Sequence, residues 1–96
     1  MKLWAVVEDS CIHMDGECGN DYELGILITV YETEEQAQSH ISDGFDPKEY
    51  KASSQNKNSK NKKRFYDKNE NRFTRRIVEI ETGVKVDLLE KGSKRV

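Results

Sequence analysis

The sequence lacks any apolar run long enough to cross a bilayer, and its apolar content is low for a globular domain. Hydrophobic residues make up 34% of the 96 residues, and charged residues make up 35%. The opening MKLWAVVEDS has one lysine and a short apolar run that acidic residues interrupt, which is not the pattern of a secretory signal. We therefore expect one small cytoplasmic domain, part of which is not packed.

Cysteine is also scarce, and the two copies lie close together. Cys11, His13 and Cys18 have the spacing C-x-H-x4-C. Thiolate and imidazole groups are ligands that Zn²⁺ prefers, but a closed site needs a fourth ligand, for which Asp15, Glu17 or a second chain is available. The simpler alternative is two reduced thiols and a surface histidine. The spacing leaves a structural zinc site and this alternative open, and we expect no other cofactor.

No group of residues indicates catalysis. Cys11 and His13 lie two residues apart, so their side chains would point to the same side of an extended strand, but no third residue is available to orient them. A long predicted strand and a helix separate His13 from His40, which is too far for a shared acid–base role. No Gly-rich segment opens a helix, as a phosphate-binding loop requires. We therefore expect a non-enzymatic protein.

Basic residues are almost absent from the first half of the chain. Residues 1–46 contain eleven acidic residues and one basic residue, whereas residues 47–96 contain seven acidic and fifteen basic residues, so the two sums are −10 and +8. Such asymmetry can mark interaction surfaces of both signs. The alternative is that the two halves pair within the fold and cancel much of the field.

Both charged regions contain candidate partner-binding residues. Acidic residues crowd the end of the first predicted hairpin, where they would bind a basic surface or imitate phosphates: Glu8, Asp9, Asp15, Glu17 and Asp21. Basic residues interleave with aromatic residues in the second half, where they would contact an anionic partner. These are Lys60, Lys62, Lys63, Arg64, Arg72, Arg75 and Arg76. In the alternative, the aromatic residues Phe65, Tyr66 and Phe73 pack inside and the arginines pair with the acidic half.

The stretch 22–41 is the most informative for the fold. Aliphatic residues alternate over 24–30, which predicts a strand, and Leu27 and Tyr31 make its second face apolar as well. Such a strand is usually central in its sheet or has one face covered by a partner. Thr33 is a good N-cap residue with Gln36 at capping-box spacing, and Gly44 lies where a helix of about three turns would end.

The remaining segments predict further strands around this unit. Alternating residues indicate strands at 2–9, 72–81 and 84–88, with a further short strand at 64–67 and a loop at 10–21. Residues 48–63 contain six lysines, one acid and almost no apolar residue, which predicts a flexible basic loop, and residues 90–96 predict a frayed tail. One helix cannot supply parallel crossovers for so many strands. We therefore predict a single α+β domain of β-β-α-β-β order, whose antiparallel sheet of four to five strands has one helix on one face.

One face of this sheet would be left uncovered by a single short helix. If strands 2–9 and 22–31 pair in register, Trp4, Val6, Leu27 and Tyr31 share the face opposite Leu3, Val7, Ile26 and Ile28. The uncovered face would expose aromatic and aliphatic area. We therefore predict self-association through Trp4, Val6, Leu27 and Tyr31, such as a homodimer, or a protein partner that covers them.

The opening MKLWAVVED and the strand–helix unit ILITVYETEEQAQSHI resemble small phage and prophage accessory proteins. Such proteins often begin with a short strand and have a T-x-E-x-A capped helix after the second strand, which here is Thr33, Glu35 and Ala37. The resemblance covers roughly the first half of the chain and brings no catalytic residue with it. It implies an accessory protein of a mobile element, a class that includes small acidic inhibitors of host defence such as anti-CRISPR proteins.

The leading interpretation is thus a non-enzymatic binding protein that inhibits a host protein or nucleoprotein by occlusion. The acidic loop would provide its first contacts and the basic segment its second. The alternative is a nucleic-acid-binding module that uses the basic C-terminal half. Neither interpretation involves a membrane partner.

Overall fold

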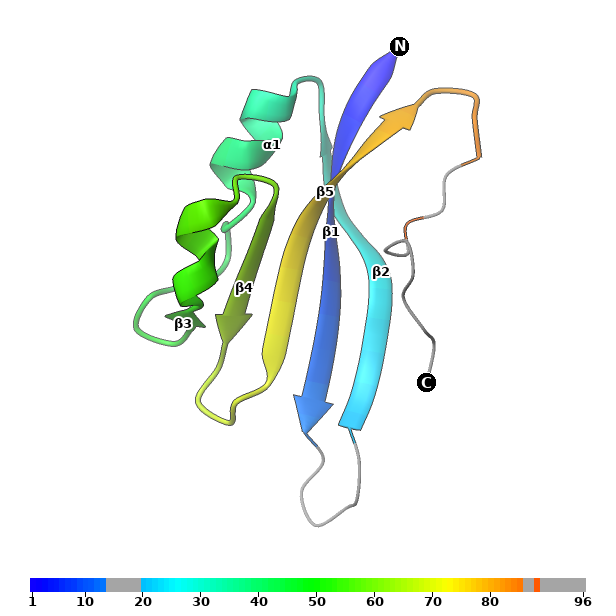
Figure 1. Cartoon of the computed structure of the whole chain (residues 1–96). Helices are drawn as coiled ribbons and strands as arrows, with labels where there is room; N and C mark the ends of the chain where they lie inside the picture. Colours follow the sequence, from blue (N-terminus) through cyan, green and yellow to red (C-terminus); the bar gives the residue numbers. More distant parts are fainter. Residues whose placement is uncertain (14–19, 86–87, 89–96) are drawn as a thin grey trace.

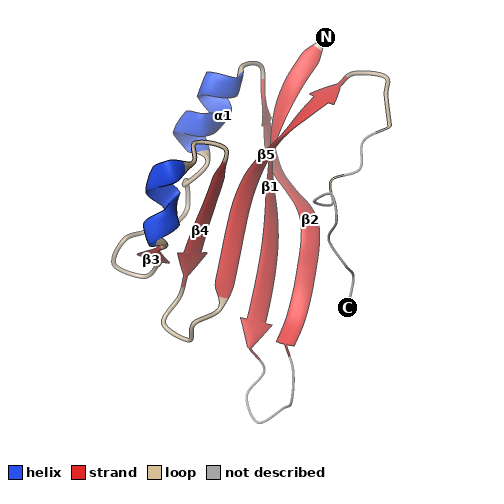
Figure 2. Cartoon of the chain, in the orientation of Figure 1, coloured by secondary structure: helices blue, strands red, loops and turns tan. Residues whose placement is uncertain are grey.

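The computed structural model of the chain describes residues 1–13, 20–85 and 88. In this part of the chain, five strands form one antiparallel sheet with the order β2-β1-β5-β4-β3, accompanied by one α-helix and one 3₁₀ helix (Figure 1). The strands are β1 (Lys2–His13), β2 (Asn20–Tyr31), β3 (Lys51–Ala52), β4 (Lys62–Tyr66) and β5 (Arg72–Glu81). The helices are α1 (Glu34–His40) and η1 (Ser54–Asn58), and both lie to the same side of the sheet (Figure 2). The predicted α+β class is confirmed.

The central strands of the sheet are β1 and β5, and the core lies along β1. Ala5, Val6 and Val7 of β1 are fully buried, as expected for consecutive apolar residues of a strand with neighbours on both sides. Val6 packs against Ala37 of α1 and against Ile41, which follows the helix. Of the two alternatives for residues 22–31, the central position is excluded, because β2 lies at the edge of the sheet.

Two bulges in the pairing of β1 with β2 change which side chains share a face. Val6 pairs with Thr29 but Val7 pairs with Leu27, so Ile28 is an extra residue on β2. A second register shift lies between Glu8 and Ser10. Because the in-register pairing does not hold, Leu27 lies on the same face as Val7 and not on that of Val6.

The predicted self-association face is therefore divided between the two sides of the sheet. Trp4 and Tyr31 pack around the cluster of Val6, Ala37 and Ile41 on the α1 side, and Val6 is fully buried. Leu27 lies on the opposite face and is half exposed. These residues do not form one exposed face, and the homodimer itself stays a prediction.

The N-terminus of α1 confirms the predicted cap. The backbone N–H of Gln36 donates a hydrogen bond to Oγ1 of Thr33 at 3.1 Å, while Glu34 and Glu35 occupy the first turn. The helix has seven residues, about two turns instead of the three predicted, because the chain turns after His40. Gly44 has φ +90°, in the region that favours glycine, and lies in this turn.

Replacing Thr33 by alanine is expected to lower the free energy of unfolding by about 1 kcal/mol, because the Gln36 N–H loses its acceptor at the helix start. Urea denaturation followed by circular dichroism measures this loss. Thr82→Ala, at an exposed turn position after β5, is the matched control and is expected to change stability by less than about 0.5 kcal/mol. Equal losses in the two variants would contradict the role of the cap.

The segment 48–63, predicted to be a flexible loop, contains β3, η1 and the first residues of β4. Side-chain to backbone hydrogen bonds hold it to the sheet. The Asn56 side chain donates to the Arg64 carbonyl at 2.9 Å and accepts from the Arg64 N–H at 2.8 Å, as a neighbouring strand would. Composition could not reveal this, because the segment is held by paired polar groups and not by apolar burial.

The strand predicted at 84–88 is not found in its described residues. Val84, Lys85 and Leu88 lie outside any strand, and β5 ends at Glu81. The remainder of that segment and the predicted tail 90–96 lie outside the described residues.

Candidate nucleic-acid interface

Two ion pairs connect β1 with β5 across the centre of the sheet. Glu8 accepts a hydrogen bond from Nε of Arg75 at 2.7 Å, and Asp9 accepts one from Nε of Arg76 at 2.7 Å. None of the four side chains is more than 20% exposed. Pairing between the acidic and basic halves is therefore found at these residues. Four of the predicted partner-binding side chains are engaged within the domain.

Asp9 also holds the bulged part of β2. Gly25 has φ +70°, and its N–H donates to Oδ1 of Asp9 at 2.8 Å, which satisfies a backbone group that the bulge removes from the ladder. Burial raises the pKa of Asp9. The effect of burial is outweighed by the hydrogen bonds from Arg76 and Gly25 and by the positive charges of Arg76 and Lys62. The pKa of Asp9 therefore lies below its ordinary value.

Arg75 fixes the turn that follows α1. Its Nη1 donates to the carbonyl of Asp43 at 3.1 Å and lies 3.5 Å from that of Ile41, while its guanidinium carbon lies 4.6 Å from the ring centroid of Phe45. The same side chain pairs with Glu8 on β1. One buried arginine therefore joins the sheet, the end of the helix and the next loop.

The aromatic residues of β4 and β5 pack inward against this loop. Phe65 stacks on Phe45 with ring centroids 4.2 Å apart, and Phe73 lies 5.8 Å from Tyr50 in an edge-to-face arrangement. The alternative in which the aromatic residues pack inside is therefore confirmed for Phe65 and Phe73 but not for Tyr66. Their neighbours along each strand must point to the opposite face, which is the face away from α1 and is termed the open face below. Leu88 lies over part of this face, where its carbonyl accepts a hydrogen bond from Nη2 of Arg76.

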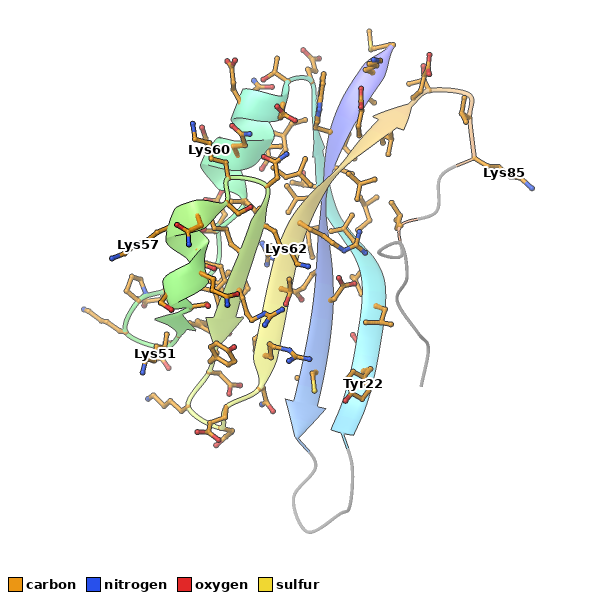
Figure 3. The ribbon with its side chains drawn as sticks, viewed as in Figure 1. Tyr22, Lys51, Lys57, Lys60, Lys62 and Lys85 are labelled. Atoms are coloured by element: carbon orange, nitrogen blue, oxygen red, sulfur yellow. The ribbon has the colours of Figure 1, made fainter. Side chains whose placement is uncertain are left out.

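A single row of paired residues crosses all five strands on the open face. Tyr22 of β2 pairs with Cys11 of β1, Cys11 with Arg72 of β5, Arg72 with Tyr66 of β4, and Tyr66 with Lys51 of β3. Directly paired residues of antiparallel strands have their side chains on the same face. Figure 3 shows Tyr22 and Lys51, the two ends of this transverse row, at opposite edges of the sheet.

Arg64 adds a further positive charge beside this row, where it pairs with Thr74. Among the described residues, no acidic side chain forms an ion pair with Arg64 or Arg72, in contrast to Arg75 and Arg76. A hollow of about 150 Å³ lies over this part of the open face. It is lined by Asp9, Ser10, Cys11, Tyr22, Leu24, Lys62, Arg64, Arg72 and Thr74.

The other predicted basic residues are distributed around β4. Lys62 lies on the open face near Asp9 and contributes to its lowered pKa. Lys63 points the other way and donates to the Asn56 carbonyl at 2.5 Å. Lys60 is exposed in the turn before β4. The predicted basic set is therefore split, and only part of it faces the transverse row.

The predicted metal ligands Cys11, His13 and Cys18 lie only partly within the residues that the structure describes. Cys11 lies in β1 and not in a loop as predicted, because β1 continues to His13. The Cys11 residue is 6% exposed. Cys18 lies outside the described residues, as do Asp15 and Glu17 of the predicted acidic surface. Asp21 belongs to β2. Within the described ranges, no group of three His, Cys, Asp or Glu residues is arranged to hold a metal ion.

Sequence reasoning missed Tyr22 and Lys51 as members of the basic and aromatic surface. Both come from segments with other predicted roles, and only the strand register aligns them with Arg72 and Tyr66. The short-range signal that was available is the alternation of arginine and aromatic residues at 64–66 and 72–73. This alternation indicates an inward aromatic face and an outward basic face.

Comparison with known proteins adds no family. No family model matches the chain, and no curated protein or solved structure matches it. In the residues that the structure describes, neither helix has the length and apolar character needed to cross a membrane.

Proposed function

We propose that this chain is a non-enzymatic nucleic-acid-binding module and that the open face is its binding surface. The observation that carries the proposal is the transverse row, in which Arg72 lies between Tyr66 and Cys11 and beside Arg64. Arginine guanidinium groups bind phosphate oxygens, and exposed tyrosine rings can stack on bases. This combination favours a polyanion that also carries aromatic rings over a purely anionic protein surface.

The distribution of charge supports this proposal over binding through the acidic loop. Glu8 and Asp9 are engaged with Arg75 and Arg76 and are therefore not available to a partner. The same pairing removes two positive charges from the surface. Arg64 and Arg72 then remain as the outward arginines of β4 and β5. Inhibition of a host protein or nucleoprotein by a phage-type accessory protein stays a prediction, and occlusion of a nucleoprotein would be compatible with the same surface.

The proposal is tested by fluorescence anisotropy with labelled DNA and RNA oligonucleotides at 50 to 200 mM salt. The double variant Arg64→Gln/Arg72→Gln is expected to bind roughly tenfold more weakly, because two phosphate contacts are lost. The slope of log affinity against log salt is expected to fall by about 1.4, at about 0.7 per contact for single strands.

A matched control removes two positive charges far from the transverse row. Lys2→Gln/Lys85→Gln makes the same change in net charge at two exposed positions, one at the start of β1 and one beyond β5, where Figure 3 shows Lys85. It is expected to keep nearly the wild-type affinity and salt slope. If wild-type protein binds no oligonucleotide at 50 mM salt, or if both double variants lose affinity equally, the proposed function is wrong.

A further inference from the structure

We infer that the nucleic acid bound on the open face is a single strand, with one base stacked on Tyr22 and another on Tyr66. This inference rests on the proposed function and specifies its ligand. Tyr22 is 37% exposed and Tyr66 is half-buried, so ring area of both is open to contact. Arg72 lies between them in the row, where it can contact the backbone that connects the two bases.

The spacing of the two rings excludes a continuous base stack between them. Tyr22 and Tyr66 are three strand spacings apart, or about 14 Å at about 4.8 Å per spacing. Two bases that stack on these rings must therefore be splayed apart. Unpaired nucleotides adopt such a geometry readily, whereas the bases of a duplex are stacked on one another and paired inside the helix.

Adjoining hollows on the surface form a path that leads from Tyr22 to Tyr66. The hollow beside Tyr22 shares Lys62 and Arg64 with a neighbouring hollow of about 130 Å³. That hollow in turn shares Ser53 and Asn56 with a large open depression that Tyr66 lines. The depressions therefore adjoin one another from β2 to the region of β3 and η1. A chain of single-stranded nucleotides fits such a shallow path, whereas a rigid duplex would rest on its rim.

The polar residues along this path fit unpaired bases as well. The Asn56 amide lines two of the three hollows but is already bonded to the Arg64 backbone. Ser53 lines the same two hollows with its hydroxyl, and Gln55 lines one of them with its amide. Such groups hydrogen-bond to base edges that are exposed only when the bases are unpaired. Lys51 and Lys57 line the last hollow (Figure 3), where Lys63 adds a third positive charge and Asp67 and Glu70 add two negative charges.

The test compares fluorescein-labelled dT12, U12 and a 12-base-pair DNA duplex in anisotropy titrations with the full chain. We expect at least one of the two single strands to bind tenfold or more tightly than the duplex. The comparison of dT12 with U12 shows whether the protein prefers single-stranded DNA or single-stranded RNA. Tyr22→Leu and Tyr66→Leu are each expected to weaken single-strand binding by about 5- to 150-fold, which corresponds to the loss of one base–aromatic stack.

The salt slope separates stacking from charge. Tyr22→Leu and Tyr66→Leu are expected to leave the slope unchanged, and Tyr22→Phe and Tyr66→Phe are expected to retain affinity because they keep the ring. Unchanged thermal unfolding shows that each variant is folded. Equal affinity for duplex and single strands, or wild-type binding by both leucine variants, would overturn this inference. The proposed function would then still stand on the Arg64→Gln/Arg72→Gln result, whereas no binding at all would overturn the proposed function itself.

Discussion

Replacing Asp9 by asparagine is expected to lower the free energy of unfolding by about 3 kcal/mol at pH 7. The reason is the guanidinium of Arg76, whose side chain is 8% exposed and would lose the charge of the carboxylate that pairs with it. Asparagine retains an oxygen for the Gly25 N–H, so the loss reports mainly on the ion pair. Urea denaturation at pH 7 measures it. Glu79→Gln, which removes an exposed pair with Lys2, is the control and is expected to cost less than about 1 kcal/mol.

The pH dependence of this effect follows from the lowered pKa of Asp9. Its pKa in the folded state lies below the ordinary value of 3.8, so the stabilisation is fully present above that value. It is lost as the pH falls through the pKa of the folded state. The difference in stability between wild type and Asp9→Asn is therefore expected to shrink progressively below about pH 4. A difference that stays constant down to pH 2, or an Asp9→Asn loss no larger than that of Glu79→Gln, would contradict the role of the pair.

A second variant separates the ion pair from the packing of the two side chains. The double change Asp9→Asn/Arg76→Met removes both charges together, leaves neither one buried without a partner, and keeps an oxygen for the Gly25 N–H. It is expected to be more stable than Arg76→Met alone, which leaves the Asp9 carboxylate unpaired. Equal stability of the two variants would show that Asp9 does not need a counter-charge at this position.

The order of elements could be predicted from the sequence because it depends on local pattern. Thr33 and Gln36 predict the helix start, and the alternation of residues along 72–81 predicts β5. The position of each strand in the sheet could not be predicted, because it depends on pairing over long sequence separations. The apolar character of both faces of β2 favoured a central strand, yet β2 is an edge strand whose bulges rotate Leu27 to the face opposite Val6.

The candidate site could be predicted only in part, for a related reason. Arginine and aromatic residues in 64–76 indicate a basic and aromatic surface. They do not indicate which of the arginines pair within the fold and which can bind a partner. Arg75 and Arg76 are adjacent in sequence and point to opposite faces, and each meets its own acid because β1 pairs with β5. Arg72 meets Tyr66 and Cys11 through the same pairing. Net charge and spacing carry no information about these partners.

Replacing Arg75 by methionine is expected to have the largest effect on stability, a loss of about 4 kcal/mol in the free energy of unfolding. The change leaves the Glu8 carboxylate, 20% exposed, without its partner. It also removes the donor to the Asp43 carbonyl and the cation over the Phe45 ring. Urea denaturation measures the loss, and hydrogen exchange of the amides of residues 41–45 locates it. These amides are expected to lose protection before those of β1, because Arg75 joins their turn to the sheet.

Two further variants show whether the geometry of Arg75 or only its charge matters. Arg75→Lys keeps the charge but replaces the two guanidinium nitrogens that donate to Glu8 and to the Asp43 carbonyl by a single nitrogen, so it is expected to recover less than half of the loss. Arg72→Met removes an arginine of the open face and is expected to cost less than about 1 kcal/mol. Wild-type stability of Arg75→Lys would reduce the role of Arg75 to charge alone. Arg72→Met, stable but weakened in oligonucleotide binding, would distinguish an arginine that binds a partner from one that holds the fold.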